Sequence, residues 1–525
     1  MYENEFIKKI NNYFIFNRKL VFFVTFFTAL IVHFSYYSQL ISITDSFQYG
    51  SQYLPGEWEI SLGRWGIYFF NKLRFGIVSP FFIGIISFAV LGIASILIND
   101  LLNVESKIVR IIISIIIAVS PYVYNILLYT YVADTYFIAM LFAILSAKFL
   151  LEKCKKHRIL GILCCICSLS IYQSFLSVTV SFGIIILFLD FIKNEIDFRE
   201  FLKKIFVIVI DIIVSLIIYY IITKIILNIL QIDVANYYGM TDNFKYIIQN
   251  IFNGIYGTYI DCIKYYFLGF INNSKYFINI IYLMIFILLN INIINIILVN
   301  SNKLYNIFPK ILTWGILFII LPIMQNCISL IIPTARLAWP MTTSYIIPII
   351  LYVVTIEDAL YVRRVFKLTK YIEITLVIYL IYTYIFLGEA TYISLQKNYN
   401  QIHSQLIRVI DRIENDDNYS KEVKIKIVGG KDFREYIPIY DFAGLGTRVG
   451  FFGKVGEISS SYLKEEFGIP NELATNEEME EIYKTDEYKK MKEFPDKESV
   501  KFINNVIVVK LESNEYSMNK IKQEN

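Results

Sequence analysis

The chain has 525 residues, of which 56% are apolar, 17% aromatic and only 18% charged. This composition excludes an ordinary soluble globule. The formal net charge of +4 is spread over loops instead of forming a stripe, so it does not indicate a nucleic-acid-binding protein. Apolar runs of about 18–25 residues recur along the chain, the length that crosses about 30 Å of hydrocarbon. The sequence therefore predicts a polytopic membrane protein.

Apolar runs and the basic segments between them predict eleven membrane spans. The first follows a basic segment and is too long for a signal-peptide core, so we interpret it as an uncleaved anchor. The predicted spans are 20–41, 77–98, 110–130, 134–151, 159–172, 174–192, 205–230, 276–299, 309–332, 340–356 and 371–389.

The fifth and sixth spans come from one apolar stretch of 34 residues, 159–192. A single helix of that length would be roughly 52 Å long, which is too long to cross once. Two short helices that break near Tyr172, Gln173 and Ser174 fit better.

The segment 240–270 differs from the spans, because apolar residues recur in it at three- and four-residue spacing with polar residues between them. That pattern predicts an amphipathic helix in the membrane interface, which either shelters a lipid tail or packs against the bundle.

The charge pattern changes near residue 390. The first 390 residues carry a formal charge near +8, whereas the rest contains 20 Lys or Arg and 24 Asp or Glu. We predict a transmembrane domain over 1–390 and a soluble α+β domain over 391–525. Within the latter we expect a helix near 398–415, strands at 423–428 and 504–511, and a solvated face or loop over 471–500, so that the whole fold is mainly α.

Lysine and arginine counts predict the orientation. With the N-terminus in the cytoplasm, the cytoplasmic segments hold 21 of these residues and the outer segments before the tail hold 7. Merging the fifth and sixth spans would place the basic 193–204 loop outside. The count therefore favours eleven spans and an extracytoplasmic C-terminal domain.

This orientation collects polar residues on the outer side. Ionisable groups within the membrane are energetically costly and often mark function. The alternative is that loops must be polar in any case, and that an arginine near a helix end often only extends its charged group to the interface. Their collection on one face is more informative than any single member. The residues are Asp45, Glu57, Glu59, Arg64, Asp134, Gln173 and Arg336.

Several motifs resemble a known family in their order and spacing. They are TDSFQYG followed by GRWG in the first outer loop, SPYVYNILLYTYVADTYFIAM over 120–140, SLSIYQSFLS over 168–177, and VKIKIVGG and NVIVVKL in the tail. Together they resemble the bacterial membrane glucosyltransferases that modify O-antigen, the Gtr type II group. The resemblance implies a GT-C-like transmembrane bundle in the bacterial cytoplasmic membrane.

That family resemblance implies transfer of a hexose, glucose in this group, from a polyprenyl-phosphate-linked donor to a cell-surface glycan outside the membrane. An aspartate at the membrane surface suits a general base, and we assign Asp45 to that role. Arginine matches phosphate oxygens bidentately, so Arg64 and Arg336 are assigned to the leaving phosphate, with Lys72 and Arg74 as secondary candidates.

The remaining substrate-binding candidates face the sugar. Asp134 and Gln173 are assigned to sugar hydroxyls, and Tyr172 forms the Tyr-Gln pair that the family carries at this place. Trp65 is either a sugar-stacking residue or an interfacial anchor, and the same two interpretations hold for Trp58 and Trp339.

One departure from the family pattern lies in the first loop. The family often has two adjacent acids there, whereas Asp45 is followed by Ser46. If the second acid holds a metal or orients the first, its function is either missing or supplied by Glu57 or Glu59. We predict no metal site and no cofactor from the residues themselves.

Other motifs do not indicate function. GLGTRVG (444–450) is one residue longer than the dinucleotide fingerprint and does not lead into a clear helix. Cys164, Cys165 and Cys167 lie in an apolar span, where cysteine ordinarily acts as a small hydrophobic residue. The three histidines are far apart in sequence and form no metal or triad pattern.

Two other functions share some of these features. A flippase for lipid-linked glycans also has many spans, but transporters often show repeated halves and polar groups near the midplane, and no repeat is evident here. A glycan polymerase would share the donor chemistry and the outer site. A structural membrane protein would leave the acidic first loop unexplained.

Overall fold

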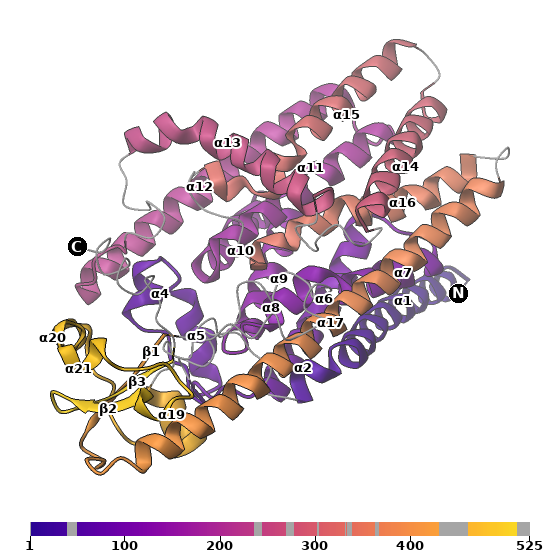
Figure 1. Cartoon of the computed structure of the whole chain (residues 1–525). Helices are drawn as coiled ribbons and strands as arrows, with labels where there is room; N and C mark the ends of the chain where they lie inside the picture. The colour runs from indigo at the N-terminus through magenta and orange to yellow at the C-terminus, as the bar shows by residue number, and fades with distance from the viewer. Residues whose placement is uncertain are drawn as a thin grey trace.

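The computed structural model describes residues 2–38, 50–235, 244–268, 278–301, 304–330, 332, 339–362, 367–429 and 460–511. Long helices make up most of it, and a small sheet lies at one end of the molecule (Figure 1). The helices of the first half are α1 (Tyr2–Val32), α2 (Phe34–Ser38), α4 (Glu57–Ser61), α5 (Gly66–Leu73), α6 (Pro80–Leu101), α7 (Lys107–Val119), α8 (Pro121–Leu127), α9 (Ala133–Leu150), α10 (Lys155–Ile171), η1 (Gln173–Phe175), α11 (Leu176–Ile192) and α12 (Phe198–Leu230).

The second half continues the bundle and then forms the C-terminal segment. Its elements are α13 (Phe244–Tyr266), α14 (Ile278–Val299), α15 (Leu304–Gln325), η2 (Cys327–Leu330), η3 (Trp339–Ile346), α16 (Ile347–Val362), α17 (Lys367–Glu414), β1 (Lys424–Val428), α19 (Ser460–Phe467), α20 (Asn476–Lys484), α21 (Asp486–Lys489), η7 (Lys497–Ser499), β2 (Val500–Ile503) and β3 (Val506–Lys510).

Among the described residues, eight helices are long and apolar enough to cross a membrane. They are Pro80–Leu101, Lys107–Leu127, Ala133–Leu150, Gln173–Ile192, Phe198–Leu230, Ile278–Val299, Asn306–Gln325 and Tyr371–Glu414. The other predicted spans, 20–41, 159–172 and 340–356, correspond largely to α1, α10 and the η3–α16 segment. A mainly helical membrane protein is thereby confirmed, and the count of eleven stays a prediction.

The predicted break between the fifth and sixth spans is present. Helix α10 ends at Ile171, Tyr172 adopts an extended backbone with φ −155° and ψ 111°, and the short helix η1 begins at Gln173. Both α10 and α11 pack on α9. The break therefore brings Tyr172 and Gln173 to the end of the bundle where α9 begins.

Helix α17 joins the bundle to the C-terminal segment without interruption. It has 48 residues, which is about 72 Å at 1.5 Å per residue, so the predicted span 371–389 and the predicted helix near 398–415 belong to one helix. No Gly or Pro follows Gly388 within it. Figure 1 shows α17 running along the molecule to the sheet.

The C-terminal segment has its own core. Its sheet has the order β1-β3-β2, with β1 parallel to β3 and β2 antiparallel to β3. The predicted strands 423–428 and 504–511 correspond to β1 and β3. Strand β2 was not predicted; it joins β3 through Asn504 and Asn505, whose positive φ values of 49° and 61° suit a tight hairpin.

The acidic stretch 471–500 is only partly a solvated face. It contains α20, which exposes most of its acidic side chains but buries Met479 and Ile482 against the second face of the sheet. The interpretation as a loop was wrong for this part, because one apolar residue per turn is enough to fix a short helix on a sheet.

Helix α5 packs closely on α10 at the position of a glycine. A Cβ added to Gly66 would overlap Ser170 Oγ and lie 3.0 Å from the carbonyl carbon of Ser170. Gly63, three residues earlier, has φ +76°, and a Cβ there would meet the Tyr219 hydroxyl. Both glycines of the GRWG motif therefore have steric reasons to be glycine.

We expect Gly66→Ala to destabilise the fold by about 1–3 kcal/mol, because an extra methyl group in a close-packed contact forces the two helices apart. The measurement is thermal unfolding of the purified protein in detergent. The matched control is Gly257→Ala in α13, where no heavy atom lies within 4 Å of the added Cβ. Equal stability of the two variants would contradict the close α5–α10 contact.

Candidate functional site

Five of the seven predicted catalytic and substrate-binding residues lie among the described residues. Asp45 and Arg336 lie outside them. Arg64, Trp65, Tyr172 and Gln173 come together at one end of the bundle, and Asp134 lies at the start of α9 near the same end. The predicted collection of polar residues at one end is present for this described set.

Arg64 lies over an aromatic ring at the helix break. Its guanidinium carbon is 4.9 Å from the centre of the Tyr172 ring. The backbone N–H of Arg64 donates to the carbonyl of Glu59 at 2.8 Å, which turns the chain back after α4. This cation–π contact orients the guanidinium of Arg64 against the helix break.

Gln173 ties the Arg64 loop to the same break. Its Nε2 donates to the carbonyl oxygen of Leu62 at 2.7 Å and to the hydroxyl oxygen of Tyr219 at 2.8 Å. The Tyr219 hydroxyl in turn donates to the carbonyl of Gly63 at 3.0 Å. Both donors of the Gln173 amide are thus used within the protein, so its contribution here is to position the loop. The predicted contact with sugar hydroxyls stays a prediction.

Trp65 is fixed to α12 one turn beyond Tyr219. Its Nε1 donates to Thr223 Oγ1 at 3.1 Å, and Thr223 donates to the Tyr219 carbonyl at 2.8 Å. The indole therefore has a specific protein partner, which a loosely held interfacial anchor would not need. Sequence reasoning missed Tyr219 and Thr223, although two polar residues at i and i+4 in the apolar run of α12 are a signal for this face.

Asp134 forms a buried ion pair with Arg74. The Arg74 Nη1 donates to Asp134 Oδ1 at 3.0 Å, and the exposed fractions of the two side chains are 14% and 7%. Asp134 also accepts from the backbone N–H of Thr135 at 2.9 Å. Arg74 donates further to Asn71 Oδ1 and to the Tyr131 carbonyl.

These contacts give Arg74 a structural role. Burial lowers the pKa of its guanidinium, and the neighbouring Asp134 carboxylate opposes that shift. Arg74 directs three of its five N–H donors at protein acceptors, and its assignment as a secondary phosphate ligand stays a prediction. Lys72, the other secondary candidate, is exposed and contacts the Tyr68 ring at 5.5 Å.

Both carboxylate oxygens of Glu59, one of the two candidates for the missing second acid, accept hydrogen bonds within the protein. Its Oε1 accepts from the Tyr53 hydroxyl and its Oε2 from the backbone N–H of Gly56, each at 2.8 Å. These bonds cap the start of α4. Glu57, on the same helix, is exposed. Neither arrangement resembles a metal site, and within the described residues no group of three or more His, Cys, Asp or Glu side chains could hold a metal ion.

The C-terminal half contacts both flanks of the first loop. Before it, His33 contacts the Tyr392 hydroxyl at 2.8 Å and Ser35 donates to Glu389 at 3.4 Å, and both partners lie on α17. After it, the backbone N–H of Ser51 donates to Glu465 on α19 at 2.8 Å. Sequence reasoning missed Glu465, and no local pattern distinguishes it from the other acids of α19.

The comparisons with known proteins agree with the motifs. The family model described as glucosyl transferase GtrII matches residues 43–356, more than half of the chain. The chain belongs to the GtrII glucosyltransferase family. Its apolar helices and this family together make it a membrane glucosyltransferase. No curated protein and no solved structure matches the chain.

The range matched by the GtrII family contains all seven predicted site residues but not the tail. The resemblance seen in the first loop, in 120–140 and in 168–177 is thereby confirmed. The resemblance of VKIKIVGG and NVIVVKL in the tail is outside the matched residues and stays a prediction.

We expect Gln173→Ala and Tyr219→Phe to be energetically coupled, because one hydroxyl group connects Gln173 to the Gly63 carbonyl. Each single variant should lower the free energy of unfolding by about 1–3 kcal/mol. A double-mutant cycle, followed by unfolding in mixed detergents, should give an interaction energy of at least about 0.5 kcal/mol.

The control for this cycle is Tyr220→Phe, which lies next to Tyr219 but is 60% exposed. It should add independently to Gln173→Ala. Additive energies for Gln173→Ala and Tyr219→Phe would show that the hydrogen-bonded chain does not hold the loop.

Proposed function

We propose that this GtrII family member transfers glucose from a polyprenyl-phosphate-linked donor to a cell-surface glycan at the outer face of the bacterial cytoplasmic membrane. The observation that carries the proposal is Arg64, held over Tyr172 and next to the loop that Gln173 ties down, at one end of an apolar bundle. A cation at that depth suits a lipid-linked phosphate, whose tail lies in the bilayer and whose charge lies at its surface.

The proposed step needs one base and one phosphate ligand. The acceptor hydroxyl oxygen forms a bond to the anomeric carbon while the bond from that carbon to the phosphate oxygen breaks. Asp45 takes the hydroxyl proton, and the polyprenyl phosphate leaves with the bonding electrons. Arg64, together with Arg336, stabilises the charge that develops on the phosphate.

The sugar-binding part of the proposal uses the residues around the break. Asp134 and Gln173 are the candidates for sugar hydroxyls, and Trp65 and Tyr172 supply aromatic faces. The rings of Tyr136 and Tyr172 lie 4.8 Å apart, so the aromatic surface near Arg64 extends to α9. Neither a metal nor another cofactor is needed for the step as written.

We further propose the domain division 1–390 and 391–525, with the N-terminus in the cytoplasm and the C-terminal domain outside. The Lys and Arg count supports this orientation. The contact of Glu465 with Ser51 supports it as well, because it puts the C-terminal sheet at the same end of the bundle as Arg64 (Figure 1). The site and the tail therefore share one side of the membrane.

Analysis of surface glycans from cells with and without the gene tests this function. Loss of one side-branch hexose supports the transferase. Loss of chain length would indicate a polymerase instead, and intact glycan with a trapped precursor would indicate a flippase.

We expect Asp45→Asn to abolish glucosyl transfer while leaving the amount of folded protein unchanged, because an amide cannot accept the hydroxyl proton. The measurement is the side-branch hexose on the surface glycan, with membrane protein quantified in the same cells. Glu105→Gln, an exposed acid just before α7, is the control and should keep activity. Undiminished transfer by Asp45→Asn would contradict the assignment of Asp45 as the general base.

We expect Arg64→Gln to lower kcat by about 10²–10³-fold, the effect of removing one preorganised charge-stabilising donor group. Arg64→Lys should recover part of the rate, because it keeps the charge but loses the bidentate fork. The rates are measured with purified protein and a polyprenyl-phosphate glucose donor. Lys156→Gln, an exposed cation at the start of α10, should behave like the unmodified chain. If both changes at Arg64 raised only KM, a role in the transition state would be excluded.

A further inference from the structure

A second polar feature lies at the opposite end of α9 from Asp134. Asp134 is in the first turn of this helix and Leu150 is its last residue, so the two are about 24 Å apart along the axis. At the Leu150 end, α9, α10 and α12 surround a cavity of about 570 Å³. Five basic and three acidic side chains line it together with apolar ones: Leu150, Leu151, Glu152, Lys153, Arg158, Asp197, Arg199, Glu200, Lys203, Lys204, Val207 and Ile208.

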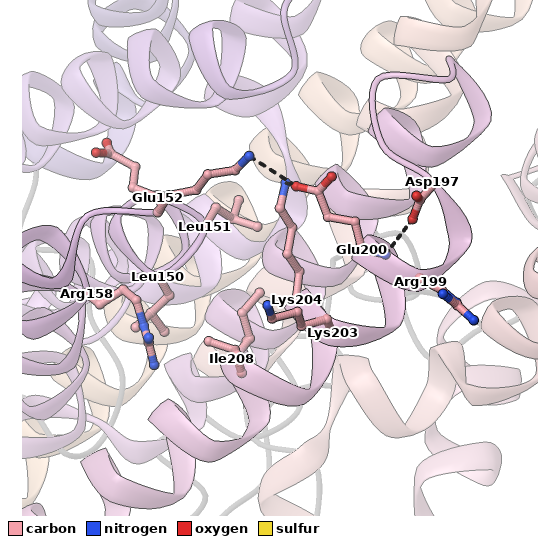
Figure 2. A pocket seen from close by; sticks show the side chains of 12 residues that line it. Leu150, Leu151, Glu152, Arg158, Asp197, Arg199, Glu200, Lys203, Lys204 and Ile208 are labelled. Atoms are coloured by element: carbon pink, nitrogen blue, oxygen red, sulfur yellow. Dashed lines mark hydrogen bonds and ion pairs between the residues drawn. The ribbon is translucent and has the colours of Figure 1, made fainter.

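The lining is ordered from apolar to charged in the same direction on two helices. On α12, Lys203 and Lys204 precede Val207 and Ile208 by four residues, so each lysine lies one turn above an aliphatic side chain on the same face. At the end of α9, Leu150 and Leu151 are followed directly by a glutamate and a lysine. The cavity is thus lined by both aliphatic and charged side chains, with the charged ones nearer the helix ends; Figure 2 shows these side chains.

The acids do not balance the positive charge. Glu200 accepts from both Lys153 and Lys204 at 3.3 Å, so one carboxylate serves two ammonium groups from two elements. Arg158 is matched by Asp211 in a bidentate pair at 2.9 and 2.7 Å. Within the part of the chain that the structure describes, Lys203 and Arg199 make no ion pair. The other two lining acids are engaged elsewhere, Glu152 with His157 and Asp197 with the backbone N–H of Glu200. With Asp211 counted, four acids face five basic side chains, and Lys203 and Arg199 carry the surplus.

The apolar surface continues from this cavity along α12. Phe206, Val209, Ile210 and Ile213 are between 40% and 66% exposed, as expected for a helix side that faces lipid tails. An occupant of the cavity can therefore place an anionic group against the lysines and an apolar chain along α12 without burying an unpaired charge.

We propose that this cavity binds the phosphate headgroup of an anionic membrane lipid. Lys203 and Lys204, with Lys153, contact the phosphate, and the acyl chains lie along Val207, Ile208 and the exposed side of α12. Basic pockets between transmembrane helices recognise lipid headgroups by this combination of charge and apolar wall. The site is separate from the proposed glucosyl-transfer site and does not depend on it.

Binding of lipids to the full-length protein in nonionic detergent tests the proposal, with occupancy followed by native mass spectrometry. The probes are phosphatidylglycerol, phosphatidylcholine and glycerol phosphate. We expect phosphatidylglycerol to bind in preference to the zwitterionic lipid. We also expect that glycerol phosphate fails to displace it at equal concentration.

The variants are Lys203→Gln, which breaks no ion pair, and the double variant Lys203→Gln/Lys204→Gln. We expect about fivefold weaker phosphatidylglycerol binding for the single variant and more than tenfold for the double one. Lys155→Gln/Lys156→Gln is the matched control, because both lysines are exposed at the start of α10 and neither lines the cavity.

Three outcomes would overturn the proposal. Equal loss of binding in the control variant would mean that diffuse surface charge holds the lipid. Equal binding of phosphatidylglycerol and phosphatidylcholine would show that the lysines do not select an anionic headgroup. Displacement of phosphatidylglycerol by an equal concentration of glycerol phosphate would show that the cavity binds a soluble phosphate and not a lipid.

Discussion

The candidate site depends on the side-chain amide of Gln173. A membrane helix normally satisfies all its backbone groups internally, so a break in one frees polar groups that must find partners elsewhere. At the break between α10 and α11, Gln173 uses its amide to hold the Leu62 carbonyl and the Tyr219 hydroxyl. The turn that carries Arg64 is thereby held at the break between α10 and α11. The guanidinium of Arg64 lies over the ring of Tyr172. One side chain thus joins the first loop, the break and α12.

The continuity of α17 places a second constraint on the same region. Because this helix runs from the bundle into the C-terminal segment, the sheet cannot move far without moving the helix. Its Tyr392 and Glu389 contact α1–α2, and Glu465 of the C-terminal segment holds the backbone of Ser51. His33, Ser35 and Ser51, on either side of this stretch of sequence, thus contact residues from the C-terminal third.

Periodicity, charge and helix length were enough to predict the class of protein, the break at Tyr172 and two of the three strands. They were not enough for features that depend on tertiary contacts. The lysine and arginine counts do not predict which acid pairs with Arg74. Only the structure shows that Arg74 donates to Asp134, Asn71 and Tyr131. A change of charge near residue 390 suggested a domain boundary, but such a change does not end a helix that no Gly or Pro interrupts. Tyr219 and Thr223 were hidden in an apolar run, because their partners come from the first loop.

The two ends of α9 show how the bilayer organises this chain. Polar groups cannot be solvated in hydrocarbon, so they gather where the helices end, and each end acquires a different chemistry from its loops. One end carries a buried ion pair, aromatic rings and a fixed arginine, whereas the other carries lysines in excess above aliphatic side chains. A lipid phosphate is the ligand class that suits both ends, since its charge lies at the surface and its tail in the core. The two ends differ in the groups beside the cation: the rings of Tyr172 and Tyr136 pack together at the first end, whereas Val207 and Ile208 line the second. The aromatic rings, more than the positive charge, are therefore what distinguishes the end where glucosyl transfer is proposed.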